Sequence, residues 1–128
     1  MTQEEKRLLL KDLSARLPYG VIAYASEINK NGIITDVNIP YHVVNLTFDN
    51  DDGKYELVPL FDIKPYLRPM SSMTSDERFE HDELQHFYTH GLDFNVDEVD
   101  WLNAHHFDYR GLIPMGLALE APDGMYKK

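Results

Sequence analysis

The first twenty residues have the hydrophobic spacing of an amphipathic helix. Leucines recur every three or four positions, and charged side chains occupy most of the positions between them. These leucines are Leu9, Leu10, Leu13 and Leu17. Thr2 and Glu5 have the spacing of a capping box, in which each side chain bonds the backbone amide of the other residue. We therefore predict a helix that begins after Thr2 and ends at Pro18 and Gly20.

From Val21 to Leu60 the pattern changes to the alternation that is typical of β-strands. We predict four short strands, joined by tight turns, in an antiparallel meander. Asn31-Gly32 predicts a hairpin turn because both residues tolerate a positive φ. Pro59 indicates that the fourth strand lies at an edge, since proline cannot donate a ladder hydrogen bond. The strand residues are Val21–Ala25; Ile33, Thr35, Val37 and Ile39 on one face; Val44, Leu46 and Phe48; and Tyr55, Leu57, Val58 and Leu60.

The second half of the chain is predicted to be mainly helical. Thr74 and Glu77 form a second capping box, which predicts a helix from Ser75 to about residue 89. Asn95 and Glu98 repeat this spacing before a last helix. We expect the first of these helices to face the core with Phe79, Leu84, Phe87 and Tyr88.

Two segments without helical spacing complete the chain. Lys64–Ser72 contains two prolines and is predicted to be an extended or one-turn connector. Gly111–Tyr126 is rich in glycine and proline, and we expect it to wrap the surface or to add a short strand at Leu117–Leu119.

The 128 residues are enough for a single domain with one hydrophobic core. The predicted order is one helix, four strands and two helices, which indicates an α+β fold. The meander is short enough to curl, with the residues after it, into a small SH3-like barrel. We expect the two C-terminal helices to pack against the meander.

The charge of the chain is unevenly distributed. The net charge is -10, of which residues 1–70 contribute -2 and residues 71–128 contribute -8. Non-specific binding to nucleic acids or anionic membranes depends on Lys and Arg, so this charge argues against both partners. The chain has no cysteine, which excludes disulfides and thiolate sites. No apolar stretch suits a signal peptide or a membrane span, so we expect a cytoplasmic protein. We expect no cofactor, because the sequence contains no complete cofactor motif.

Carboxylates recur at one-turn spacing along the helix predicted to begin at Ser75. The acidic face consists of Asp76, Glu80 and Glu83 in this helix, extended by Asp97, Glu98 and Asp100 in the next. A row of carboxylates can imitate a phosphate backbone, so one hypothesis is an acidic nucleic-acid mimic that occupies a DNA-binding protein. The alternative is a solvated helix surface that favours solubility.

Two histidines four residues apart suggest a candidate metal site. His86 and His90 share a face of the predicted helix, and His105 and Asp108 offer further ligands of the types that zinc binds. Such a site would support a metal-dependent hydrolase. The pattern lacks the glutamate of the metalloprotease motif, and packing or capping explains these histidines without a metal.

No complete catalytic motif is present in the sequence. No GxSxG elbow surrounds the hydroxyl side chains of Ser71–Ser75, and there is no glycine-rich phosphate loop. We therefore expect a non-enzymatic module that binds another protein. Tyr, Trp and Arg dominate binding hot spots, although packing of Trp101 and Phe107 in the core is an alternative. The predicted partner-binding residues are Tyr66, Arg68, Trp101, His105, Tyr109 and Arg110.

Several stretches of the chain resemble a family of short proteins from gut bacteria. The stretches are Leu8–Leu13, Ala15–Val21, Lys64–Thr74, Asp100–Ile113 and Gly116–Tyr126. Members of this family are often encoded near prophages or other mobile elements, and the family has no established activity. The resemblance therefore implies an accessory role for a mobile element and no catalytic residue.

Overall fold

The computed structural model describes residues 1–48, 54–87 and 96–126. Helix α1 (Gln3–Arg16) begins with the predicted capping box. The Glu5 N–H donates to Thr2 Oγ1 at 3.0 Å, and the Thr2 N–H donates to Glu5 Oε1 at 2.8 Å. A 3₁₀ turn over Leu17–Tyr19 follows, and Gly20 ends it with a φ of 70°. The core receives Leu9, Leu10 and Leu13 from α1.

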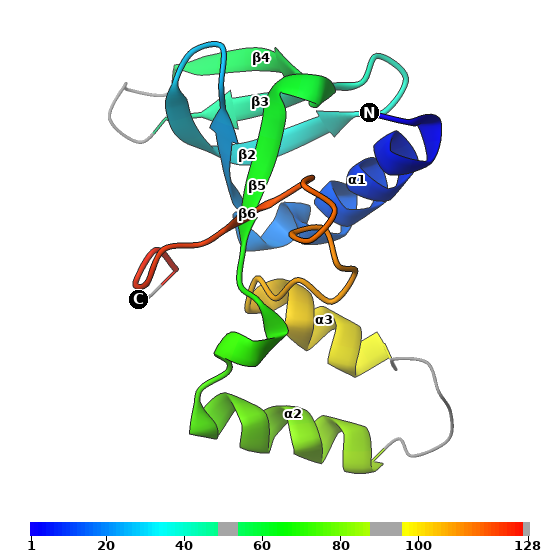
Figure 1. The fold of residues 1–128 in the computed structure, drawn as a ribbon, viewed down its shortest axis with the longest axis vertical. Coiled ribbons are helices and arrows are strands. Elements are labelled where there is room, and N and C mark those ends of the chain that lie inside the picture. The colour runs from blue at the N-terminus through cyan, green and yellow to red at the C-terminus, as the bar shows by residue number, and fades with distance from the viewer. Residues whose placement is uncertain (49–53, 88–95, 127–128) are drawn as a thin grey trace.

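A six-stranded sheet packs with α1 around this core (Figure 1). Its strands are β1 (Ile22–Ala25), β2 (Lys30–Asn38), β3 (Val43–Thr47), β4 (Tyr55–Pro59), β5 (Ile63–Leu67) and β6 (Leu119–Glu120). They lie in the order β4-β3-β2-β1-β5-β6. The antiparallel meander of β1 to β4 is confirmed, and β4 lies at an edge as predicted. β6 adds to β5 in parallel.

The prediction of a small closed barrel is wrong, because the sheet is open in the described part of the chain. β5 pairs with β1 on the side away from β2, and Pro65 lies opposite Ala23. The sequence predicted only an extended connector here, and the chain leaves β5 towards a 3₁₀ turn at Met70–Ser72. Because β5 and β6 extend the sheet beyond β1, β4 and β6 are its two separate edges.

The first hairpin turn lies earlier in the chain than predicted. Ser26–Asn29 form it, and Asn29 takes a positive φ of 50°. The Asp62 carboxylate stabilises this turn by accepting hydrogen bonds from the Ser26 hydroxyl and from the Glu27 N–H. An aspartate 35 residues from Glu27 therefore supports a turn that the local sequence did not indicate.

The predicted turn residues, Asn31 and Gly32, lie inside β2 instead. Gly32 pairs with Ala23, and a Cβ atom added to Gly32 would lie 3.0 Å from the Phe48 ring. The glycine is thus required for a close approach by an aromatic ring and not for a reversal of the chain.

An irregularity in β2 changes which side chains face the core. Ile34 pairs with Leu46, and the pairing resumes at Asp36, so Thr35 is an extra residue in β2. As a result, Ile34 and Val37 both pack in or against the core, although strict alternation places them on opposite faces. The prediction that Ile33, Thr35, Val37 and Ile39 share one face of the strand is therefore wrong.

Two helices form the end of the molecule opposite β4 (Figure 1). α2 (Ser75–Phe87) begins with the predicted Thr74–Glu77 capping box, and α3 (Val96–Ala104) follows it. Asn95, the first residue of the third predicted box, lies outside the described residues. α3 packs near α1, and α2 packs on α3. α2 therefore lies away from the meander, so the prediction that it packs against the meander is wrong.

Candidate functional site

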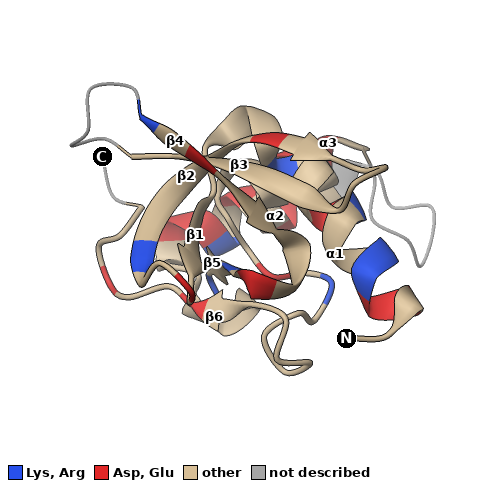
Figure 2. Ribbon diagram, turned by 90° about the horizontal axis from the view of Figure 1, so that it is seen from above, with Lys and Arg blue, Asp and Glu red and all other residues tan. Residues whose placement is uncertain are grey.

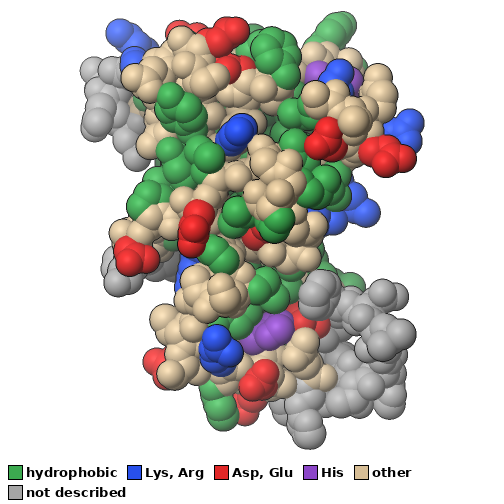
Figure 3. Space-filling view, viewed as in Figure 1, with side chains coloured by type: hydrophobic (Ala, Val, Ile, Leu, Met, Phe, Trp, Pro, Cys, Tyr) green, Lys and Arg blue, Asp and Glu red, His purple; other side chains and the backbone are tan. Residues whose placement is uncertain are grey.

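Large hydrophobic side chains are exposed near β4, the strand at one edge of the sheet. The group that we call the β4 surface consists of Ile39, Tyr41, Tyr55, Leu57 and Phe61. Tyr41 is 78% exposed and Leu57 is 65% exposed. Hydrophobic side chains reach the molecular surface at this end of the molecule (Figure 3). Exposed aromatic and aliphatic side chains that occur together are typical of interaction sites.

The register of β4 explains two members of the β4 surface. Tyr55 lies opposite Thr47, and Leu57 lies opposite Asn45. Val58 is buried in the core, so its neighbour Leu57 points to the other face of the sheet. β4 therefore carries apolar side chains on both of its faces.

Two turns flank the end of β4 and contribute the remaining members. The β2–β3 turn contains Tyr41, and the 3₁₀ turn η2 (Leu60–Asp62) contains Phe61. The Leu60 N–H donates to the His42 carbonyl at 2.8 Å, which joins the two turns. Charge is sparse along the strand: β4 contains one acidic residue and a lysine precedes it (Figure 2).

The sequence contains a signal for this surface that the hot-spot criterion did not use. An edge strand that covers a core on one face needs apolar residues on that face only. Tyr55 and Leu57 add apolar residues on the opposite face, beside a proline that marks the edge. The hot-spot criterion instead selected aromatic residues near arginines, without information about which groups the fold uses internally.

The six predicted partner-binding residues are half-buried and lie in three places. Tyr66 lies in β5, and its hydroxyl donates to Asn31 Oδ1 at 3.1 Å. At the junction of β5 with α3 lie Arg68, Trp101 and His105. Beside α1 lie Tyr109 and Arg110. Each of the six makes contacts within the chain, and their binding to a partner stays a prediction.

Arg68, Trp101 and His105 form a stacked column with Phe107. The ring centroids of Trp101 and His105 are 4.2 Å apart, and those of Trp101 and Phe107 are 5.7 Å apart. The Arg68 guanidinium lies over the Phe107 ring, 4.2 Å from its centroid. The same guanidinium donates two hydrogen bonds to the Glu77 carboxylate of α2, at 2.6 and 2.7 Å. This pairing lowers the pKa of Glu77 to about 2.

α2 is also attached to α3 by buried polar contacts. His81 Nε2 and Glu98 Oε2 are 2.6 Å apart, and the Gln85 amide donates to the same oxygen at 3.0 Å. Phe79, a predicted core residue, is 64% exposed. The apolar spacing of α2 does not mark its buried face, because that face presents groups such as His81 that pair with another helix.

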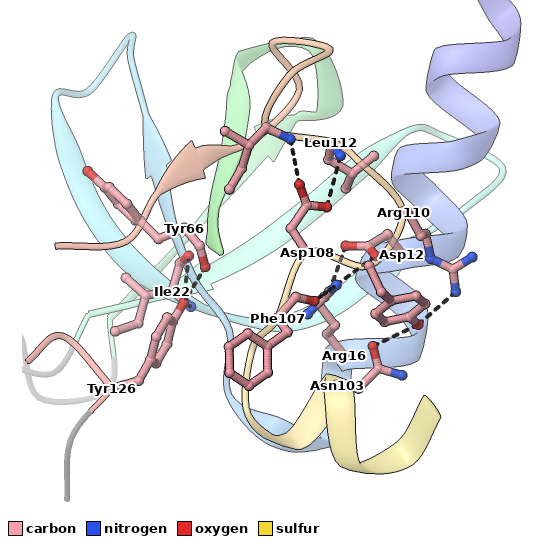
Figure 4. Close-up of polar contacts among 12 residues, drawn as sticks. Asp12, Arg16, Ile22, Tyr66, Asn103, Phe107, Asp108, Arg110, Leu112 and Tyr126 are labelled. Carbon is pink, nitrogen blue, oxygen red and sulfur yellow. Dashed lines mark hydrogen bonds and ion pairs between the residues drawn. The ribbon is translucent and has the colours of Figure 1, made fainter. Parts of the chain in front are cut away.

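Tyr109 and Arg110 belong to a buried network that joins the C-terminal segment to α1 (Figure 4). Arg16 is 0% exposed and donates from Nε to Asp12 Oδ2 at 2.7 Å and from Nη2 to the Phe107 carbonyl at 2.7 Å. Arg110 Nε donates to Asp12 Oδ1 at 3.1 Å, and its Nη2 donates to the Tyr109 hydroxyl at 3.1 Å. The role of this network is structural, because removal of one partner would leave a buried charge unpaired.

Tyr126 attaches the end of the described chain to the sheet (Figure 4). Its ring stacks on His106 with centroids 3.7 Å apart. Its hydroxyl donates to the Tyr66 carbonyl at 2.7 Å and accepts the Ile22 N–H at 2.9 Å. Burial lowers the pKa of His106 to about 4 and raises the pKa of Tyr126 to about 12. Both rings are therefore neutral at pH 7, as a packed contact requires.

The described part of the predicted metal site does not gather ligands. Asp108 accepts two backbone N–H groups at 2.8 and 2.9 Å, and His105 Nδ1 lies 2.9 Å from a backbone carbonyl. Among the described residues, no three His, Cys, Asp or Glu side chains form a group that could hold a metal ion. His90 and the side chain of His86 lie outside the described residues, so the complete site stays a prediction.

The acidic face differs in one residue from the predicted one. Its exposed members are Asp76, Glu80 and Glu83 on α2 and Asp97 and Asp100 on α3. Glu98 is buried against His81 and does not contribute to the surface. Glu80 Oε2 also accepts a hydrogen bond from Trp101 Nε1 at 3.0 Å. The hypothesis of a nucleic-acid mimic stays a prediction.

Comparisons of the chain with protein-family models, with curated proteins and with solved structures found no match. The resemblance to short proteins of gut bacteria therefore stays an expectation. In the described part of the chain, no helix has the length and the apolar composition that crossing a membrane requires.

Proposed function

We propose that this protein is a non-enzymatic interaction module that binds a protein partner through the β4 surface. The observation that carries the proposal is the exposure of five large hydrophobic side chains along the segment from residue 39 to residue 61. Folded domains rarely expose several such side chains together unless the side chains serve a contact. We place this contact in the cytoplasm, as expected from the sequence, and following the resemblance we propose that it is an accessory function of a mobile element.

The internal contacts of the other candidates support this choice of surface. A partner that binds Arg68 must compete with Glu77, and a partner that binds Arg110 must compete with Asp12. Tyr41 and the other members of the β4 surface are already exposed, so a partner binds them without breaking an ion pair.

Site-specific photo-cross-linking tests the proposal. A photo-reactive phenylalanine analogue is introduced at Tyr41, at Leu57 or, as a control of similar exposure on α2, at Phe79. We expect positions 41 and 57 to capture the same protein chain in the host cell, identified by mass spectrometry, and position 79 not to capture it. Capture of one partner at position 79, but not at positions 41 and 57, would contradict the proposal.

A further inference from the structure

In the part of the chain that the structure describes, no strand pairs with the backbone groups on one side of β4. Two hydrogen bonds mark the side that faces β3: the Phe48 N–H donates to the Lys54 carbonyl at 3.3 Å, and the Leu60 N–H donates to the His42 carbonyl at 2.8 Å. In an antiparallel ladder, such pairs alternate with pairs whose backbone groups point outward. The residues whose backbone groups point away from β3 are therefore Tyr55, Leu57 and Pro59.

Pro59 agrees independently with this alternation. Proline has no N–H group, and in a sheet it is tolerated where that group would point to solvent. The outer edge of β4 thus presents the N–H groups of Tyr55 and Leu57 and the carbonyls of all three outward residues. Within the described ranges, no other strand pairs with this edge.

Starting from the proposed function, on which this inference rests, we propose that the partner at the β4 surface is a second copy of this chain. The two β4 strands pair antiparallel about a two-fold axis at Leu57. Each Leu57 then exchanges its backbone hydrogen bonds with the second copy's Leu57, and each Tyr55 N–H donates to the second copy's Pro59 carbonyl. The two sheets join into one continuous sheet, which is pairing by strand addition.

Side-chain complementarity favours the axis at Leu57 over an axis at Glu56. An axis at Glu56 places two carboxylates directly opposite each other, which is destabilising. An axis at Leu57 places Glu56 opposite Val58, brings the two Leu57 side chains together and sets each Tyr55 across from a proline. An axis at Tyr55 requires residue 53, which is outside the described part of the chain.

The distribution of charge favours a second copy over a strongly charged partner. The charges of Lys54 and Glu56 cancel along β4 (Figure 2), and the three aspartates that precede Lys54 in the sequence, Asp49, Asp51 and Asp52, lie outside the described residues. Residues 71–128 carry -8 of the net charge, and their helices α2 and α3 lie at the opposite end of the molecule (Figure 1). Pairing through β4 directs these acidic ends away from each other, and salt screens their repulsion over a Debye length of about 8 Å. A basic partner would be attracted to the acidic end instead.

A single introduced cysteine tests the pairing directly, because the chain contains none. In the proposed dimer of Leu57→Cys, the two Cα atoms at position 57 lie about 5.5 Å apart, within the range of a disulfide. We expect mild oxidation to link Leu57→Cys chains at least about tenfold faster than Phe79→Cys chains, since pairing raises the local thiol concentration. Leu57 and Phe79 are 65% and 64% exposed, so they are matched in access to oxidant. Equal rates overturn the pairing, and faster linkage of Glu56→Cys overturns the register.

Sedimentation equilibrium gives a second measurement that needs no oxidation. We expect the mass of the unmodified chain to rise from monomer towards dimer with concentration, Leu57→Lys to stay monomeric, and Phe79→Lys to behave like the unmodified chain. A chain that stays monomeric up to millimolar concentration overturns the pairing. If the photo-cross-linking at positions 41 and 57 then captures a different protein, the proposed function holds and only the identity of the partner is wrong.

Discussion

The β4 end and the α2–α3 end of the molecule differ in which kinds of side chain are buried and which are exposed. At the β4 end, Val58 lies in the core while its neighbour Leu57 is exposed, so apolar side chains occupy both the interior and the surface. At the α2–α3 end, polar pairs such as His81 with Glu98 lie inside, and carboxylates cover much of the surface. Five large hydrophobic side chains are thus exposed at the β4 end, whereas Phe79 and Val96 are exposed among the carboxylates of the α2–α3 end.

This difference shows that residue type alone does not identify a contact surface. Trp101 and Arg68 belong to the residue types that dominate hot spots, yet their rings and charges complete an internal column that joins three elements. Tyr55 and Leu57 are instead largely exposed among the described residues. Exposure of a large apolar group is therefore the more informative observation.

The largest effect is expected at the junction between the two ends, in the network around Asp12. Asp12→Ala leaves the fully buried Arg16 without its carboxylate, so we expect a loss of about 3–5 kcal/mol in the free energy of unfolding. Urea denaturation followed by circular dichroism measures this loss. Lys11→Ala, at an exposed neighbouring position, is the control and should change stability by less than about 0.5 kcal/mol. Equal effects of the two substitutions would show that the network adds nothing.

At the β4 end, Gly32→Ala tests the close approach of the Phe48 ring to β2. The added Cβ would lie 3.0 Å from the ring, so we expect destabilisation of about 1–3 kcal/mol from overpacking. A double-mutant cycle isolates the share of the ring: in a Phe48→Ala background the same substitution should cost less, and the remaining cost comes from the Thr47 carbonyl, which would lie 3.2 Å from the added Cβ. An undiminished loss in that background would point to the backbone, including the Thr47 carbonyl of β3, and not to the ring.

At the α2–α3 end, the ion pair between Arg68 and Glu77 predicts a dependence on acid. The pKa of Glu77 is about 2 in the folded chain and 4.5 ordinarily, so the pair stabilises the fold above pH 4.5. This stabilisation is lost as the pH falls from 4.5 through 2. We expect Arg68→Met to lower stability by about 1 kcal/mol at pH 7. The difference should shrink as the pH falls from 4.5 towards 2, down to the part that the contact of Arg68 with the Phe107 ring contributes.

Fluorescence of Trp101, the single tryptophan of the chain, reports on this end of the molecule because the indole stacks in the same column. Denaturation curves read by this signal at several pH values measure the difference between the two chains. A difference that stays constant from pH 7 to pH 2 would contradict the assigned role of Glu77.

The smallest effect on stability is expected for the exposed carboxylates of α2. Asp76→Lys and Glu83→Lys should each change the free energy of unfolding by less than about 0.5 kcal/mol. If the protein is a nucleic-acid mimic, the double variant should no longer compete with DNA for a purified, non-sequence-specific DNA-binding protein. Fluorescence anisotropy of a labelled duplex measures this competition, and Leu57→Lys is the control that should retain it. Unchanged competition by the double variant would remove the mimic hypothesis.

The predictions from sequence were most accurate where the interacting residues are close in the chain. Both capping boxes that lie in the described residues were predicted, because Thr2 with Glu5 and Thr74 with Glu77 each span three positions. The meander followed from short turns, and the edge position of β4 followed from a proline. For the candidate site, the strand that carries it was predicted, but its exposed residues were not selected.

Other features depend on contacts between distant parts of the chain. Asp62, directly before the neighbouring strand β5, stabilises the turn at Ser26, and Phe48 requires the glycine in β2. The extra residue Thr35 shifts the alternation of β2, and β5 forms where prolines suggested a connector. None of these contacts has a local signature, because the partner in each case is brought close only by packing.

The amino-acid sequence by itself determined the helix starts, the order of the strands in the meander and the acidic character of the second half, since these depend on local geometry and composition. Tertiary structure alone decided which polar groups are buried: Arg16 meets the Phe107 carbonyl across 91 positions, and Arg110 meets Asp12 across 98. The same packing decided that Leu57 is exposed while Val58 is buried. The physical reason is that burial is a property of the whole assembly of elements, which no single segment of the chain encodes.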